Sequence, residues 1–558
     1  MKHLLRTLVL TMVLCMVMSN AMAATLTAAE ITNPDTDTII KLDHGLPTPE
    51  LPLVSEPITL TVMYMRETNH GNFDDMWFLE QVAKDTGITL KIIPVEKAGW
   101  TEKMNLAFAA DDLPDIFLRG LTPSDASKYG MNGSLIPLNA LLEQYAPNAN
   151  YLLNNLPNAR RNVLASDGNI YYMPAYQLTA RDQILRVGAI NTAWIDELGM
   201  NPPHTIDELY EVLKAFRDND LDGDGDSSNE IPLSFIFSMD NTDKVQDGSL
   251  AILSGYGYVD HRHDVIDGKY VYVPMENNYR EYLKFMNKLW EEDILDHEIF
   301  TQTEEQYLAK CQNYTVGLFT KGEASQYFSD DEKKRAYSLV GPLLSEVNQT
   351  PCWPAESLEA TPQTASFAIT SKCKNPEAAI KLLDYFYSDY CSTLTKCGPE
   401  KGQWNGEGGW SKHVSDDGNV SYSIEFDNQK YNSFWDFRIK NGLMNMPYVY
   451  SSDQAAIVLG ADVYASMLSS MVFDSGCYDA RREGYPNCIA FTEEEQNTLA
   501  MFILLDNQVS QWCAQFISGE KDIEDDKVWA QYISMIESMD VDTLIEIRQT
   551  AYDRWTMN

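Results

Sequence analysis

Basic residues are scarce in this chain. Lysine and arginine together number 42 in 558 residues, against 82 aspartates and glutamates, so the formal net charge is −40 at pH 7. Binding to nucleic acid needs a basic face, and anionic membrane surfaces attract the same residues. We therefore expect neither as a partner. The acidic balance suits a soluble protein that works in an ionic medium.

Long apolar runs are also missing, with one short exception at the N-terminus. The run over 8–18 follows a basic start, is too short to span a bilayer comfortably, and precedes a small-x-small cleavage signal ending at Ala23. We therefore expect a signal peptide over 1–23 and a secreted protein, extracellular, at the cell surface or in the periplasm. The alternative is an uncleaved membrane anchor. Leu14 before Cys15 argues against lipid attachment.

Several motifs of common chemistry are absent as well. The chain has no C-x-x-C pair, which argues against zinc and dithiol redox sites, and no G-x-S-x-G, H-E-x-x-H or P-loop motif. Beyond Cys15, eight cysteines all lie in the second half. Cys391 with Cys397, and Cys477 with Cys488, are the candidates for local disulfides. Free buried thiols are the alternative.

A helix with clear start signals introduces the most informative stretch. Thr205 and Glu208 form a capping pair that satisfies two backbone N–H groups reciprocally. Apolar residues then recur at helical spacing and predict a helix that ends near Asp218. These residues are Ile206, Leu209, Val212, Leu213 and Phe216.

An acidic loop follows this helix directly. Its D-x-D-x-D-G opening is that of an EF-hand calcium loop, although the closing glutamate comes one residue early. We expect one structural calcium ion as the cofactor. The expected ligands are Asp220, Asp222, Asp224, Glu230 and the main-chain carbonyl of Asp226, with Ser228 or water completing the shell. The alternative is a solvated acidic turn, in which these carboxylates would repel one another. The sequence has no second EF-hand loop to pair with this one, so a structural calcium site is favoured over a calcium-dependent switch.

Alternating strand and helix patterns predict the fold class. Strands over 58–64, 89–95 and 115–118 are separated by helices over 76–86 and 101–110, an order typical of βαβ units with a mostly parallel sheet. Further strands are expected over 187–191, 315–319 and 366–370, an elaborate loop over 398–430, and helices over 279–290, 375–387, 492–518, 528–539 and 542–555.

Several motifs, taken in order, point to a known family. They are L-P-D-I-F at 113–117, D-G-N-I-Y-Y-M-P at 167–174, the block over 194–233, F-A-I-T-S-K from 367 and the ending A-Y-D-R-W. Together they resemble the extracellular family 1 solute-binding proteins of ABC importers, in the long LplA-like, alginate-binding-protein-like branch. The loop departs from the family's common Asp-Pro-Asn-Gly-Asn-Gly, because aspartates replace asparagines and the glutamate comes one residue later.

The resemblance implies an α/β, two-lobe periplasmic-binding-protein fold (type II), with a ligand cleft between the lobes and a helical C-terminal region. The expected divisions are a signal peptide over 1–23, a linker over 24–55, an N-terminal α/β lobe over 56–180 with a return segment near 365–397, a C-terminal α/β lobe over 181–364 that carries the calcium loop 220–230, and a loop-rich and helical region over 398–558 that completes both lobes.

The resemblance also implies a function. It predicts a substrate-binding protein, not an enzyme, that holds a carbohydrate, usually an oligosaccharide, by lobe closure and delivers it to the permease of an ABC importer. We expect a monomer. The alternative is a secreted calcium-dependent carbohydrate-active enzyme, a lyase or a glycosidase, in which paired carboxylates would do acid–base work. A calcium-dependent adhesion or surface-layer protein ranks last, because such chains usually repeat.

Sugar sites combine aromatic faces with a few polar groups, and open α/β sheets place ligands beyond the carboxyl ends of their strands. On that basis the candidate substrate-binding residues are Tyr64, Arg66, Tyr172, Tyr176, Trp404, Trp410, Trp435 and Tyr448. Core packing or surface coverage is the alternative for each. Trp404 is the strongest candidate, because it lies among glycine and asparagine with little local core to fill.

Overall fold

The computed structural model describes residues 45–67, 69–237, 239, 249–321, 328, 333, 335–355, 366–404, 407–416, 418, 420–443, 446–459 and 475–557. The expected signal peptide and most of the expected linker lie outside these residues. Within the described ranges, no helix combines the length and the apolarity that a membrane crossing requires.

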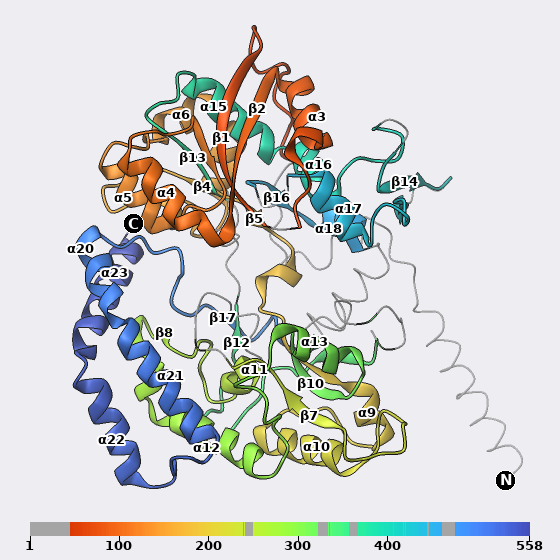
Figure 1. Ribbon diagram of the computed structural model, residues 1–558, viewed down its shortest axis with the longest axis vertical. Helices are drawn as coiled ribbons and strands as arrows, with labels where there is room; N and C mark the ends of the chain where they lie inside the picture. Colours follow the sequence, from red (N-terminus) through yellow and green to blue (C-terminus); the bar gives the residue numbers. More distant parts are fainter. Residues whose placement is uncertain are drawn as a thin grey trace, which may run out of the picture.

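A five-stranded sheet forms the core of the first lobe, in the order β2-β1-β3-β13-β4 (Figure 1). Strands β1 (Ile58–Arg66), β2 (Ile88–Glu96) and β3 (Ile116–Leu118) are parallel, as the alternation of strands and helices predicted. Strand β13 (Ser366–Ile369) returns from far along the chain and pairs antiparallel with β3 and with β4 (Met173–Pro174). The first lobe is therefore closed by a distant segment.

Helices cover both faces of this sheet. Helix α3 (Trp77–Thr86) ends at Gly87, whose φ of 75° is the left-handed value that favours glycine at a helix C-terminus. The other elements of the lobe are η1 (Phe73–Asp75), η2 (Lys97–Gly99), α4 (Trp100–Ala109), α5 (Pro123–Met131), α6 (Asn139–Tyr145), α7 (Pro147–Asn155), α8 (Ala159–Val163) and α15 (Pro376–Tyr387).

A four-stranded sheet, β11-β6-β10-β7, forms the core of the second lobe. Strand β6 (Val187–Asn191) is antiparallel to β10 (Val316–Lys321) and β11 (Tyr337–Leu339), and β10 is parallel to β7 (Ile231–Ser234). The surrounding elements are α9 (Thr192–Glu197), α10 (Ile206–Asp218), α11 (Ser249–Ser254), β8 (His263–Ile266), β9 (Lys269–Tyr272), η5 (Val273–Met275), α12 (Asn277–Glu291) and α13 (Glu304–Gln312).

Helix α10 has the predicted length and buries all five of its predicted apolar residues. Its cap differs slightly from the prediction. The Thr205 hydroxyl accepts the N–H of Glu208 at 3.1 Å, but the Glu208 carboxylate accepts the N–H of His204, at 2.8 Å, rather than that of Thr205. Two backbone donors are satisfied all the same.

The chain crosses between the lobes through short paired segments. Strand β5 (Tyr176–Gln177) pairs in parallel with β16 (Val449–Tyr450), and β12 (Trp353–Pro354) pairs with β17 (Arg481–Arg482). Both pairs lie between the two large sheets (Figure 1). The turn η3 (Ala180–Gln183) follows β5 on the way to β6. The two sheets have separate apolar cores, so the α/β, two-lobe architecture is observed.

The last third of the chain adds helices to both lobes. Beside the junction lie α16 (Asp389–Cys397), α17 (Phe434–Asn441), α18 (Ser452–Leu459) and the hairpin β14 (Trp410–Val414) with β15 (Val420–Ile424). Against the second lobe lie α21 (Ile503–Ile517), α22 (Asp526–Glu537) and α23 (Val541–Met557), while α20 (Glu493–Leu499) lies beside the first lobe. Two predictions are wrong here. The stretch over 398–430 contains a hairpin, and the helix predicted over 492–518 is interrupted by the 3-10 turn η8 (Ala500–Phe502).

The predicted local disulfides are also wrong. All eight cysteines beyond Cys15 are free thiols, and seven of them are buried. Cys391 and Cys397 lie on one helix, α16, where six residues rise about 9 Å, beyond the reach of a disulfide. Burial raises the pKa of Cys397 to about 12, so this thiol stays protonated.

Candidate functional site

The carboxyl ends of β1, β2 and β3 bring polar side chains to the junction between the lobes. Arg119, just after β3, is 2% exposed and donates to the Met65 carbonyl at 3.1 Å and the Glu67 carboxylate at 2.7 Å. The Trp100 indole N–H donates to the Gly120 carbonyl at 2.8 Å, and a Cβ on Gly120 would lie 2.3 Å from that ring. This edge of the sheet is therefore tightly built.

His70 lies beside Arg119 and has an unusually low pKa. Its ring centroid is 5.6 Å from that of Tyr64. Burial, followed by the charge of Arg119, lowers the pKa of His70 to about 4, so the imidazole is neutral at pH 7. Neither ring nitrogen has a hydrogen-bond partner within the described part of the chain. The backbone N–H of Gly71 donates to Ile439 of α17 at 3.5 Å, which places this loop beside the junction helices.

A second group of polar and aromatic side chains gathers around β16. The Lys396 ammonium lies 4.4 Å from the ring centroids of both Tyr448 and Tyr450, and it donates to the Tyr448 hydroxyl at 3.1 Å. Arg438 is 7% exposed and donates to the Lys396 carbonyl at 2.9 Å. Burial lowers the pKa of Arg438 from its ordinary value. Such cation–aromatic stacks hold ring faces in fixed orientations.

The segment that leaves β5 contributes further charged groups. Asp182 forms ion pairs with Arg181 at 3.3 Å and with Arg186 at 3.5 Å. Gln183 accepts from the Tyr478 hydroxyl at 3.2 Å, which links this segment to the one before β17. Segments near 180, 396, 440 and 480 thus meet at one place. Hydrogen-bonding groups and aromatic rings from distant parts of the chain converge there, as noncovalent binding of a polar ligand requires.

The structure places the eight predicted substrate-binding residues in three groups. Tyr64, Tyr172, Tyr176 and Trp410 are buried in the cores, where the Tyr172 hydroxyl donates to the Asn162 carbonyl at 3.1 Å and the Trp410 indole donates to the Gly398 carbonyl at 3.0 Å. Arg66 lies beside His70, to whose carbonyl it donates at 3.3 Å, and Tyr448, also buried, lies in the group around β16.

The remaining two tryptophans are more open. Trp404 is half-buried with the Lys430 ammonium 5.4 Å from its ring, and Trp435 is 47% exposed with Arg438 5.1 Å away. Sequence reasoning missed His70, Arg119, Lys396 and Arg438. These four residues belong to no sequence motif, and only the fold places them at the junction.

The acidic loop curls as its sequence predicted. Ligand oxygens of Asp220, Asp222 and Asp224 all lie within 4.8 Å of one another. The Asp220 carboxylate accepts from Gly223 at 3.0 Å and from Gly225 at 2.9 Å, and these glycines have φ of 81° and 93°. Positive φ values are what glycine permits, so the two glycines make the turn around the carboxylates possible.

The two remaining predicted ligands differ from one another. Glu230 is 7% exposed, and its Oε1 accepts from Leu221 at 2.7 Å, while its Oε2 has no hydrogen-bond partner among the residues that the structure describes. The Asp226 carboxylate accepts from the side chain and the N–H of Ser228, which lowers its pKa. The hard, oxygen-only donor set and the orphaned, buried carboxylate oxygen fit a calcium ion.

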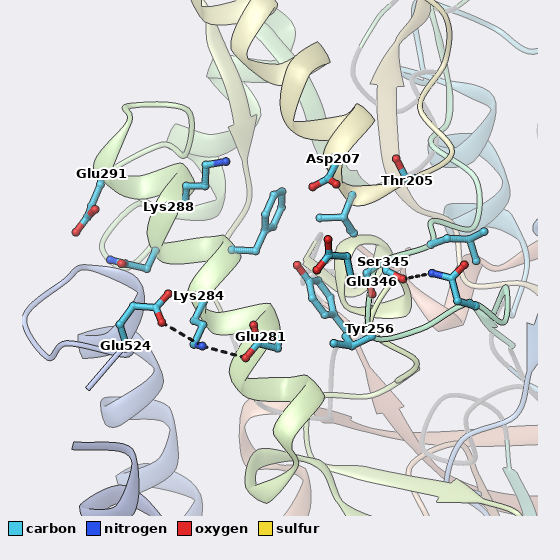
Figure 2. A pocket seen from close by; sticks show the side chains of 16 residues that line it. Thr205, Asp207, Tyr256, Glu281, Lys284, Lys288, Glu291, Ser345, Glu346 and Glu524 are labelled. Atoms are coloured by element: carbon cyan, nitrogen blue, oxygen red, sulfur yellow. Dashed lines mark hydrogen bonds and ion pairs between the residues drawn. The ribbon is translucent and has the colours of Figure 1, made fainter. Parts of the chain in front are cut away.

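A pocket of about 650 Å³ lies elsewhere, on the second lobe between α12 and the start of α10 (Figure 2). Its floor includes Tyr256, which is 5% exposed. The Lys284 ammonium is held by Glu281 at 3.0 Å and by Glu524 at 3.1 Å. The ammonium group of this lysine is therefore already paired within the protein.

Comparisons with curated proteins agree with a solute-binding fold. The chain is 27% identical over 329 residues to the fructooligosaccharide ABC transporter substrate-binding protein FusA of Streptococcus pneumoniae, a match covering 57% of this chain and 59% of FusA. It is 26% identical over 255 residues to the polygalacturonan/rhamnogalacturonan-binding protein YtcQ of Bacillus subtilis, covering 45% and 46% of the two chains. The matches thus span between about half and three-fifths of these relatives' lengths.

Solved structures extend the likeness to the whole fold. An HMO-binding, ABC-transporter-associated solute-binding protein of Bifidobacterium longum infantis superposes with a TM-score of 0.73 at 20% identity, over 90% of this chain and 100% of that one. FusA in complex with kestose gives 0.68 at 21% identity, over the same shares. A model of the bacterial extracellular solute-binding proteins matches residues 70–389. The chain belongs to this family of bacterial extracellular solute-binding proteins.

Proposed function

We propose that this protein is the extracellular substrate-binding component of an ABC importer and that it binds an oligosaccharide between its lobes. The observation that carries the proposal is the convergence at the junction of side chains from separate segments, namely Lys396, Arg438, Tyr448 and Tyr450. Membership of the solute-binding family supports it. So do the sugars named for the relatives, which are fructooligosaccharide, polygalacturonan and rhamnogalacturonan.

Binding by lobe closure requires no covalent chemistry. A ligand that contacts both lobes favours the closed arrangement over the open one, so the two lobes move about the crossing segments. Aromatic faces stack on the C–H surfaces of sugar rings, and charged side chains fix hydroxyl groups. The proposed contacts are Arg66, Trp404, Trp435 and Tyr448 from the predicted set, together with Lys396 and Arg438. The protein would act as a monomer that is exported by its signal peptide and docks on a permease.

The acidic loop is proposed to hold one structural calcium ion. Asp220, Asp222, Asp224 and Glu230 would supply carboxylate oxygens and Asp226 its carbonyl. Two structures that share the fold support calcium binding in such proteins. One is an EF-hand mutant of FusA, and the other is the alginate-binding protein AlgQ2 without calcium ion. Calcium would neutralise repulsion among these carboxylates when it binds.

A binding panel tests the proposal. Purified mature protein in millimolar calcium is titrated with fructo-, galacturono-, manno- and milk oligosaccharides in a calorimeter and in thermal-shift assays. We expect at least one to raise the melting temperature and to reduce the radius of gyration in X-ray scattering. Absence of any binding across neutral and acidic glycans would refute the proposal. Mass spectrometry of the recovered sugar must show it unchanged, because cleavage products would establish the lyase or glycosidase alternative instead.

A further inference from the structure

The C-terminal helix α23 rests on the second lobe and ends against the first (Figure 1). The Gln549 side chain accepts the N–H of Tyr270 on β9 at 2.7 Å. Arg554 makes a bidentate ion pair with Glu495 of α20, at 2.8 and 2.9 Å. The Gln549 contact therefore fixes the body of the helix to the second lobe, and Arg554 joins the end of the helix to α20.

Trp555, the next residue, packs against the core of the second lobe and also contacts the first lobe. Its indole N–H donates to the side-chain oxygen of Asn162 at 3.1 Å, and the Arg161 guanidinium lies 4.8 Å from its ring centroid. Both partners are on α8. The main-chain carbonyl of Asn162 accepts from the buried Tyr172 hydroxyl at 3.1 Å, so α8 is anchored in the core of the first lobe.

This contact lies away from the strands about which the lobes must rotate. In Figure 1, α23 meets the first lobe at the left edge of the molecule, to one side of the paired strands β5 and β16, which lie near its centre. A rotation of one lobe against the other changes separations most at points far from the axis. The contact therefore cannot persist unchanged in every arrangement of the lobes.

We infer that Trp555, Arg161 and Asn162 form a latch that sets the equilibrium between lobe arrangements and thereby the affinity for ligand. Trp555 is a positioning residue in this role, because it acts through the lobes and not on the ligand. A ligand held between two lobes selects one arrangement, so an interaction made in only one of them changes the apparent affinity by the same factor as the equilibrium. The inference rests on the lobe closure of the proposed function and not on which ligand is bound.

The size of the effect follows from the two interactions that Trp555 makes with α8. One hydrogen bond and one partly exposed cation–π interaction together change an equilibrium roughly tenfold. Trp555→Ala removes both interactions. Trp555→Phe keeps an aromatic ring but has no indole N–H, so we expect an intermediate shift. Arg161→Met removes only the guanidinium.

The test measures lobe arrangement in the full mature chain without any ligand. Small-angle X-ray scattering and hydrogen exchange of the α8 amides are compared for wild type, Trp555→Ala, Trp555→Phe and Arg161→Met. The matched control is Arg160→Met on the same helix, whose side chain donates to Asn150 and Asn154 inside the first lobe, at 3.3 and 2.9 Å. We expect the latch variants to shift the scattering profile and to speed exchange in α8 while the melting temperature stays close to wild type.

Two results would overturn the latch. One is a scattering profile identical to wild type in both Trp555→Ala and Arg161→Met. The other is an equal shift in Arg160→Met, which would mean that α8 is merely loosened. If Trp555→Ala does not fold, Arg161→Met and Trp555→Phe carry the test. Scattering is recorded without ligand, so a failure of the oligosaccharide panel leaves this result intact. If the panel finds a ligand, its affinity for the latch variants must change by the same factor as the equilibrium between lobe arrangements.

Discussion

Asp384 on α15 caps a helix to which it is not connected in sequence. Helix α7 begins after Ala146, whose side chain offers no cap. Asp384 is 1% exposed, and its Oδ1 accepts the N–H of Ala149, in the first turn of α7, at 3.0 Å. Its Oδ2 has no hydrogen-bond partner in the described ranges. Burial raises the pKa of Asp384 to about 7, against the opposing effect of the hydrogen bonds from α7.

The sign of the pH dependence follows from this raised pKa. The carboxyl holds its proton more tightly in the folded protein than in the unfolded chain, whose aspartates titrate near 3.9. Its contribution is therefore fully present below about pH 4 and is lost as pH rises through 7. A difference of about 3 pKa units corresponds to ~4 kcal/mol of folding free energy at pH 8. That figure is an upper bound for a single group.

Asp384→Asn isolates this contribution. The amide keeps an oxygen for the Ala149 N–H but cannot ionise. The free energy of unfolding of the variant, measured relative to that of wild type, should therefore increase from pH 5 to pH 8. Asp384→Ala also removes the cap and should be about 1 kcal/mol less stable than Asp384→Asn at both pH values. Denaturant unfolding at pH 5 and pH 8 measures the difference, and Asp74→Asn on the exposed turn η1 is the control. An unchanged pH dependence in Asp384→Asn would refute the reasoning.

Three further predictions concern other groups. Replacing Asp222 and Asp224 with alanine should lower the melting temperature in millimolar calcium and abolish the gain from adding calcium; equal melting with and without chelator in wild type would contradict the metal. Asp264, fully buried, pairs bidentately with Arg482 at 2.7 and 2.8 Å, so Asp264→Ala should cost ~3–5 kcal/mol in denaturant unfolding, and near-wild-type stability would contradict a paired buried charge. The lowered pKa of His70 means that its stabilising contribution is lost as pH falls from 6.5 towards 4; NMR should show one imidazole still neutral at pH 5.5, and a titration near 6.5 would contradict its burial.

Sequence patterns correctly predicted the helices and strands whose apolar spacing and caps lie within a short stretch of the chain. Helix α10 has both its apolar face and its cap within 14 residues, and β1, β2 and β3 are separated by helices of ordinary length. Sequence reasoning could therefore place them to within two residues. The acidic loop was equally readable, because five of its carboxylates lie within 11 positions and glycines lie at its turns.

The junction could not be read in the same way. Lys396 and Tyr448 are 52 positions apart and carry no shared motif, so only the packing of α16 against β16, where the Val449 N–H donates to the Ser392 hydroxyl at 3.0 Å, brings them together. Tyr64 and Tyr176 were chosen because they follow or lie in strands, but strand position does not say which face of a sheet a side chain occupies. Both rings are buried in the first lobe. Sequence reasoning missed the hairpin over 410–424, because its alternation of apolar and polar residues is short and lies among glycine-rich segments.

The position of the acidic loop explains why calcium should act on stability and not on ligand contact. Strand β6 leaves the crossing segment at Val187, so β7, which runs opposite to β6, returns towards the junction. The loop precedes β7 and therefore lies at the end of the sheet away from the junction. Glu230 ties the loop's end to Leu221 at 2.7 Å, and the next residue, Ile231, donates to Thr315 beside β10 at 2.8 Å. A cation there would hold β7 in register with β10, so removing the cation should lower the melting temperature. The folded protein should still bind oligosaccharide with nearly the same affinity.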